Sequence, residues 1–274
     1  MTAYLLTDSR TMLRRSLRRM RRYPSLTFFV AAIPVILLLL FVFVFGGTLG
    51  AGLDGPAAPT AAGGATLGRE AYLAYVMPGI LLMTIVGAAQ GTAITVAMDM
   101  TAGIIARFRT MAIARAAVLA GHVLGSIVQT GLAMVIVLVV AVLVGFRPTT
   151  EPVAWLAAAG LIALTSLAVG WLSVGMGMVT GSVETASNIP MILTLLVLLS
   201  SAFVPTDTMP APLAWFAEHQ PFTPITETLR GLLFATPVGD SAVVAVAWCI
   251  GIAAVGYAWA LRLYERVPQR PAAA

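Results

Sequence analysis

The sequence predicts an all-α membrane protein with six transmembrane helices, and composition is the first observation behind this prediction. Hydrophobic residues make up 59% of the 274 positions and charged residues only 10%. A soluble domain of average composition is about half apolar and a quarter charged. So few charged side chains cannot cover the core of a soluble globule of this length. The surface of the protein is therefore expected to face lipid.

Long apolar segments are the second observation. A helix that crosses a bilayer needs about 20 mostly apolar residues. Six segments meet this requirement: Leu26–Phe45, Leu73–Met98, Ala117–Val144, Val153–Thr180, Ala186–Val204 and Ala242–Leu263. The first segment follows a strongly charged stretch and is not followed by a small-residue cleavage site, which favours a retained span over a removed signal peptide. Pro34 and Pro190 lie inside spans, where packed neighbours satisfy the carbonyl groups that proline frees.

The distribution of arginine is the third observation, and it predicts the orientation of the spans. All 16 basic residues are arginine, since the chain has no lysine. With six spans, thirteen of them fall on the side that carries both termini: Arg10, Arg14, Arg15, Arg18, Arg19, Arg21, Arg22, Arg107, Arg109, Arg115, Arg262, Arg266 and Arg270. The positive-inside rule places this side in the cytoplasm, so the chain is expected in the cell membrane with both termini inside. The same bias accounts for the pI of about 10.0, and no nucleic-acid partner is expected.

A single domain is expected, in five parts. They are a cytoplasmic amphipathic helix (1–25), five spans (26–204), an outer segment (205–240), the last span (241–264) and a cytoplasmic tail (265–274). In the first part, four apolar residues share one helical face with arginines around it: Leu6, Leu13, Leu17 and Met20. Such a helix is expected to lie on the inner membrane surface, its arginines against anionic lipid headgroups. A charge cluster that only fixes topology is the alternative, and the two interpretations are compatible.

The outer segment is long for a loop and has two apolar-periodic pieces, divided at Pro221 and Pro224. These pieces predict two short helices that lie in the outer interface or dip into it. Trp215 and Phe216 are typical interface anchors for one of them.

Titratable groups indicate neither a catalytic nor a metal site. Without lysine the chain cannot form an ATP-binding P-loop, and the lone Cys249 excludes an internal disulfide or a cysteine metal cluster. No His/Glu pair has metal-ligand spacing, and His122 is expected to be a hydrogen-bonded polar residue at a helix end. No span carries a carboxylate at mid-bilayer, which counts against a proton-coupled transporter. In the outer segment, Glu227 and Arg230 are three residues apart and are expected to pair on one helical face.

Uncharged polar residues and glycine pairs are found in the spans. The polar residues of the second and third spans are Gln90, Thr92, Thr95, Gln129 and Thr130. The glycine pairs, each four residues apart, are Gly87/Gly91, Gly121/Gly125 and Gly177/Gly181. Small residues at this spacing let helices approach closely. Hydrogen bonding between helices is the favoured interpretation of the polar residues, and a pathway for a bulky amphiphilic substrate is the alternative.

A short basic stretch follows the second span. Asp99 is placed to cap a new helix, and Gly103 allows a bend. Arg107 and Arg109 flank Phe108, and an aromatic side chain among arginines is typical of the energetic centre of a protein interface. A short helix that docks on a cytoplasmic partner is therefore expected, with enforcement of topology as the alternative.

Three stretches of this sequence resemble the ABC-2 type transporter permeases, and within them the actinobacterial daunorubicin/doxorubicin-resistance group. They are "DMTAGIIARFRTMAIARAAVLAG", "GSVETASNIPMI" and "SSAFVPTDTMPAPLAWFAEHQPFTPITETLRGLL". The resemblance covers nearly the whole chain. It implies the type V exporter fold and a non-catalytic permease subunit that pairs with a second copy or a sister permease. Two separate ATPase subunits would bind ATP and Mg.

The resemblance also implies roles for particular residues. The coupling helix and a second contact with the ATPase correspond to Asp99, Gly103, Arg107, Phe108, Arg109, Arg115 and Glu184. The outer gate corresponds to Phe203, Trp215, Phe216, Glu227 and Arg230. The implied function is export of an amphiphilic compound, either a drug or a lipid-like molecule. A secondary transporter or passive channel for small amphiphiles is the alternative, while a membrane-embedded enzyme would need a polar catalytic cluster that the sequence lacks.

Overall fold

The structure is a computed structural model that describes residues 2–22, 24–46, 67–105, 115–148 and 151–266. All regular elements in these ranges are helical. The longer helices are α1 (Thr2–Arg22), α2 (Pro24–Leu40), α4 (Leu67–Thr101), α6 (Arg115–Val144), α7 (Pro152–Val179) and α12 (Ser241–Arg266). The shorter ones are the π-helix η1 (Phe41–Phe45), α8 (Val183–Asn188), α9 (Met191–Leu198), the 3₁₀ turn η2 (Thr206–Thr208), α10 (Ala211–His219) and α11 (Phe222–Phe234).

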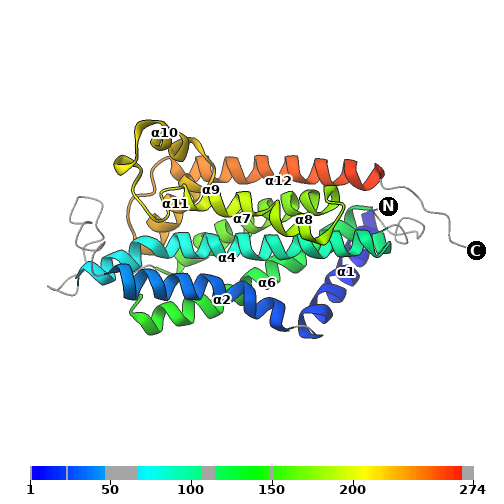
Figure 1. Cartoon of the computed structure of the whole chain (residues 1–274), viewed down its shortest axis with the longest axis horizontal. Coiled ribbons are helices and arrows are strands. Elements are labelled where there is room, and N and C mark those ends of the chain that lie inside the picture. Colours follow the sequence, from blue (N-terminus) through cyan, green and yellow to red (C-terminus); the bar gives the residue numbers. More distant parts are fainter. Residues whose placement is uncertain (1, 23, 47–66, 106–114, 149–150, 267–274) are drawn as a thin grey trace, which may run out of the picture.

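Five helices form an elongated bundle in which α4 is central (Figure 1). Each is long and apolar enough to cross a membrane: Thr27–Phe45, Glu70–Thr101, Ala116–Val144, Pro152–Val179 and Ser241–Arg266. In α4, 89% of the most apolar stretch is buried, against 17% in the last helix. The helices at the periphery of the bundle therefore expose large apolar side chains on their outward faces, for example Leu143 in α6 and Val243 in α12. This matches a bundle whose surrounding medium is lipid.

The fifth predicted span, Ala186–Val204, is not one continuous helix. It is divided into α8 and α9, and the backbone is no longer helical beyond Leu198. Pro190 explains the interruption because proline has no N–H to continue the helical ladder. The two pieces together run only from Val183 to Leu198, which is shorter than the roughly 20 residues of a spanning helix. Among the described residues, five helices are therefore long enough to span a membrane, and the predicted fifth span is present as two shorter helices.

The helix α1 packs across the bundle rather than standing apart from it. It lies obliquely at one end of the bundle, where the C-terminal end of α12 is also found (Figure 1). Met12 is buried, whereas Leu17 from the predicted apolar face stays 37% exposed. The face of α1 that contacts protein is thus rotated from the one that carries the leucines.

The opposite end of the bundle gathers α9, α10 and α11 (Figure 1). The two short helices predicted for the outer segment are present, and the division between them falls at Gln220–Pro221. Pro224 does not divide them, because it stands in the first turn of α11, where a missing N–H costs no helical hydrogen bond. Most of α11 is buried, and α10 is largely exposed.

Candidate functional site

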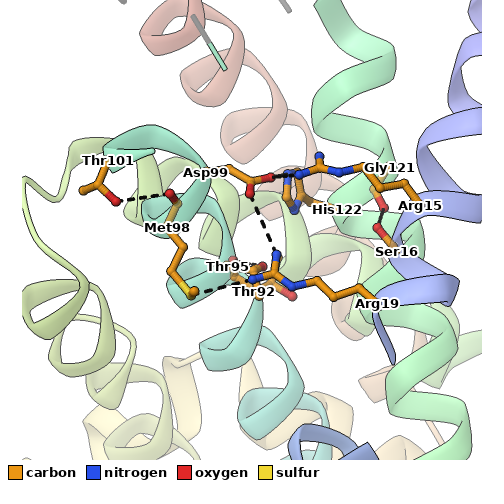
Figure 2. A network of polar contacts seen from close by, with 10 residues as sticks. All are labelled: Arg15, Ser16, Arg19, Thr92, Thr95, Met98, Asp99, Thr101, Gly121 and His122. Atoms are coloured by element: carbon orange, nitrogen blue, oxygen red, sulfur yellow. Dashed lines mark hydrogen bonds and ion pairs between the residues drawn. The ribbon is translucent and has the colours of Figure 1, made fainter. Parts of the chain in front are cut away.

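Asp99 lies at the centre of a charged cluster that joins three helices. It stands in the last turn of α4 and is 3% exposed. Its carboxylate oxygens lie 2.9 Å from Arg15 Nη2, 3.8 Å from Arg19 Nη1 and 3.3 Å from His122 Nε2. Figure 2 shows both guanidinium groups reaching from α1 toward this carboxylate. The expectation that Asp99 caps a new helix is wrong, because its side chain is held between α1 and α6 instead.

The glycines of α6 explain why α1 can pack so closely against α6. A Cβ atom on Gly121 would collide with Met12, and one on Gly125 would lie 2.8 Å from the Ser16 Cβ. The Ser16 hydroxyl donates to the Gly121 carbonyl at 3.2 Å. This pair of glycines therefore acts as predicted, as a surface for close helix packing. The close approach in turn brings Arg15, one residue before Ser16, within reach of Asp99.

A cavity of about 60 Å³ lies beside the cluster. Its walls come from α1, α4 and α6: Arg15, Ser16, Arg19, Met20, Gly91, Thr92, Thr95, Asp99, His122, Gly125, Ser126 and Gln129. Pockets for drug-sized molecules measure about 300–1,000 Å³. The cavity is therefore too small in this structure to hold a compound of that size.

The structure brings together only part of the predicted substrate pathway. Thr92, Thr95 and Gln129 line the cavity. Gln90 instead donates to the Ser187 carbonyl at 2.7 Å and so ties α4 to α8. The Thr130 hydroxyl is buried away from the cavity lining and makes no hydrogen bond among the described residues. Gln90 thus fits the favoured interpretation of helix-to-helix bonding.

The predicted coupling residues are only partly described. Gly103 has φ 69°, a left-handed conformation that suits glycine, so the chain bends there as predicted. Glu184 is exposed in the first turn of α8, and α8 lies toward the end of the bundle that carries α1 (Figure 1). Arg107, Phe108 and Arg109 lie outside the described residues, as does the side chain of Arg115.

Arg230 forms a second polar site, at the other end of α4. Its Nη2 donates to the Ser201 carbonyl at 2.9 Å and to the Tyr75 carbonyl at 3.3 Å. Its Cζ lies 4.1 Å from the centroid of the Tyr75 ring, and the Tyr75 hydroxyl also donates to Ser201, at 3.0 Å. Burial lowers the pKa of the Arg230 guanidinium, but a guanidinium stays protonated in proteins. The positively charged guanidinium of Arg230 therefore lies against the non-helical segment after α9.

The expected pair of Glu227 with Arg230 is not formed. Glu227 accepts a hydrogen bond from the Ser241 hydroxyl at 2.9 Å, which links α11 to α12. Arg230 turns toward Ser201 because the chain there has left the helix, and its carbonyl groups need donors from elsewhere. The i, i+3 spacing permits a pair between Glu227 and Arg230, but the guanidinium donates to the Ser201 carbonyl instead.

The remaining predicted gate residues fall into two environments. Phe203 is 7% exposed and stacks on Phe41 with ring centroids 5.1 Å apart. It packs against Gly79, where a Cβ would lie 3.0 Å from the Phe203 ring. Trp215 and Phe216 lie on the exposed surface of α10. Phe203 thus belongs to the packed segment after α9, and Arg230 of α11 donates to the Ser201 carbonyl of that segment.

Several members of the two polar sites were not predicted from the sequence. Arg15 and Arg19 were expected on the membrane surface, and Tyr75 and Ser201 were given no role. Arg15 is 84 residues from Asp99 in the chain, so no local pattern connects them. His122 was expected to be hydrogen bonded at a helix end, and its contact with Asp99 confirms this.

Comparison with known proteins identifies the family. The model of the ABC-2 type transporter family matches residues 7–234. The daunorubicin resistance ABC transporter permease protein DrrB1 of Streptomyces coeruleorubidus is 24% identical over 256 residues, covering 93% of this chain and 85% of that protein. The probable doxorubicin resistance ABC transporter permease protein DrrC of Mycobacterium tuberculosis is 21% identical over 187 residues, 68% of each chain. The chain therefore belongs to the ABC-2 type transporter family and is a multi-pass homologue of drug-resistance permeases.

Proposed function

We propose that this chain is the permease subunit of an ATP-binding cassette exporter that moves an amphiphilic drug-like or lipid-like compound out of the cell. The observation that carries the proposal is the family match over residues 7–234. The names of the similar permeases, which refer to daunorubicin and doxorubicin resistance, support the substrate class. The chain has no lysine for a P-loop, so a separate subunit must hydrolyse the ATP.

The proposed assembly has two copies of the ATPase, each with ATP and Mg, and two permeases, either identical or sister chains. The chain lies in the cell membrane with both termini in the cytoplasm. The excess of arginine on that side supports this orientation. α1 then lies at the inner interface, and α10 and α11 form outer helices that dip into the membrane from the other face.

In the proposed mechanism, closure of the ATPase pair presses on the segment 99–115 and tilts the spans. Arg107, Phe108 and Arg109 contact the ATPase. The cluster around Asp99 supports this role because it ties the end of α4 to α1 and α6. A push on the segment that follows α4 is thereby shared by three helices. The polar segment around Arg230 is the part of the outer gate that must rearrange for release.

Association with an ATPase tests the proposal. An ABC ATPase of the same organism is co-expressed with the chain, and the membrane complex is purified through a tag on the permease. We expect stoichiometric recovery of the ATPase and ATP hydrolysis that an amphiphilic substrate stimulates. Recovery of the permease alone, with transport intact in liposomes that lack any ATPase, would instead identify a secondary transporter or channel.

A further inference from the structure

The cavity between α1, α4 and α6 has a surplus of positive charge. Arg15 and Arg19 contribute two positive charges to its lining, while Asp99 contributes the only carboxylate among the lining residues. The formal charge is therefore +1 even when His122 is neutral. Asp99 engages Arg15 closely, at 2.9 Å, and Arg19 only at 3.8 Å.

Arg19 has donors that the protein barely uses. Besides the long contact with Asp99, its Nη2 lies 3.7 Å from the Met98 sulfur, and thioether sulfur is a weak acceptor. A guanidinium offers five N–H donors in a planar fork that matches phosphate oxygens. In Figure 2 the group lies beside Thr92 and Thr95, at the cavity.

The uncharged groups of the lining add further donors. Neither the Gln129 amide nor the Ser126 hydroxyl makes a hydrogen bond within the part of the chain that the structure describes, and both residues line the cavity. Thr92 and Thr95 use their hydroxyl protons on the carbonyls of the preceding helical turn. The donors left for a ligand are thus a guanidinium, an amide and a hydroxyl, which together favour an anion with several oxygen atoms.

The volume of the cavity limits which ligands it can hold. About 60 Å³ holds roughly four to six water molecules, at about 10–15 Å³ each. That is room for one phosphate group and not for a drug-sized molecule. From the charge, the donors and the volume, we infer that this cavity binds the phosphate group of an anionic phospholipid.

A lipid is favoured over a soluble phosphate by the side chains that α1 and the start of α2 expose. Arg14 and Arg18 are exposed on the same helix and extend the positive surface outward. Leu17, also on α1, and Phe28 on α2 expose apolar side chains nearby in the chain. A phospholipid brings an anionic headgroup and acyl chains together, so it satisfies both surfaces. A bound headgroup then contacts α1, α4 and α6 at once and holds α1 against the bundle.

The test uses the full chain purified in detergent. Native mass spectrometry counts retained phosphatidylglycerol or phosphatidylcholine, and thermal melting measures stabilisation by each lipid and by inorganic phosphate alone. The variants are Arg19→Gln and Gln129→Leu. Arg18→Gln is the matched control, since it removes the same charge from an exposed position one residue away. Circular dichroism checks that each variant is folded.

We expect phosphatidylglycerol to be retained and to raise the melting temperature, with phosphatidylcholine much weaker. Arg19→Gln weakens phosphatidylglycerol binding about tenfold, the size expected for a charged hydrogen bond. Gln129→Leu weakens it several-fold without changing the charge, and Arg18→Gln changes it less than twofold. Because the ATPase is absent, the result is independent of the proposed transport function.

Three outcomes would overturn the inference. Equal losses in Arg18→Gln and Arg19→Gln show that the lipid responds only to the overall charge of α1. Unchanged binding in Gln129→Leu shows that the cavity is not the site. Stabilisation by inorganic phosphate that Arg19→Gln abolishes, without retention of phosphatidylglycerol, shows that the occupant is a soluble phosphate and not a lipid.

Discussion

A buried carboxylate is costly unless positive or donating groups surround it. Asp99 meets this condition through Arg15 and His122, whose nitrogen atoms lie 2.9 Å and 3.3 Å from its oxygens. These partners come from α1 and α6, so one side chain holds three helices together. At the residue scale, the charge of Asp99 is therefore expected to stabilise the end of the bundle from which the segment 99–115 leaves.

Asp99→Asn tests that role. The amide keeps the shape but loses the negative charge, and we expect a loss of about 1–3 kcal/mol in unfolding free energy, as for hydrogen bonds to charged groups. The lower part of the range applies if water solvates Arg15, whose side chain is 39% exposed. Thermal melting in detergent measures the effect, with exposed Glu218→Gln as the control. A melting temperature equal to that of the control would contradict the role.

Arg230 provides a second residue-scale test, in which two variants separate competing explanations. Arg230→Lys keeps the charge but loses the guanidinium, whose Nη2 donates to both the Ser201 and Tyr75 carbonyls and whose Cζ lies over the Tyr75 ring. We expect a loss of about 1–3 kcal/mol. Glu227→Gln keeps an acceptor for Ser241 and should be nearly neutral. If Glu227→Gln lowers the unfolding free energy as much as Arg230→Lys does, a charge pair between Glu227 and Arg230 stabilises the protein and the explanation through the carbonyl groups is wrong.

At the scale of elements, the contact of α1 with α6 depends on the absence of side chains at two positions. Met12 and Ser16 occupy the space that a Cβ on Gly121 or Gly125 would need. Interhelical packing through small residues is effective in membranes because lipid tails compete with apolar side chains but not with close backbone contact. The orientation of α1 therefore follows from α6 as much as from its own sequence.

Gly121→Ala tests this packing, with Gly131→Ala on the same helix as the control. A Cβ at Gly121 meets Met12, while nothing lies within 4 Å of one at Gly131. We expect Gly121→Ala to cost about 1–3 kcal/mol, as for overpacked cores. Gly131→Ala should be neutral or stabilising by up to about 1 kcal/mol. Melting temperatures and the rate of proteolysis within α1 give the comparison, and equal behaviour of the two variants would refute the close-packing explanation.

The sequence was informative wherever one pattern is strong and local. Mostly apolar runs of about 20 residues or more predicted the five long helices, and Pro221 predicted the division between α10 and α11. Contacts that depend on distant partners were not predictable. Nothing near Asp99 indicates that Arg15 lies 2.9 Å away, and the i, i+3 spacing of Glu227 and Arg230 misled because the carbonyls after α9 are an alternative partner. Pro190 was recognised, but hydropathy alone favoured an unbroken span.

At the scale of the whole molecule, the two polar sites lie toward opposite ends of the central helix α4. The Asp99 cluster is in its last turn, and Tyr75 stands near its start. If an ATPase drives the protein, force enters at one end of α4 and release occurs at the other. α4 is also the most deeply buried of the five long helices. A displacement of α4 therefore changes its contacts with the helices packed around it.

Charge reversal tests where the force enters. Arg107→Glu combined with Arg109→Glu is expected to weaken association with the ATPase at least tenfold, because arginines beside an aromatic anchor often dominate interface energy. Arg147→Glu, an exposed change after the other end of α6, is the control. Association is measured by co-purification from membranes. If the double variant retains the ATPase and transport as well as the control does, the coupling role of these residues is wrong.

The proposed function requires that the permease moves amphiphiles only when an ATPase subunit hydrolyses ATP. Its most direct test is transport of a fluorescent amphiphile into inside-out proteoliposomes that contain the permease, the ATPase or both. The proposed function predicts accumulation only with both proteins and ATP, and none with a non-hydrolysable analogue. Accumulation by the permease alone, or equally without ATP, would contradict it.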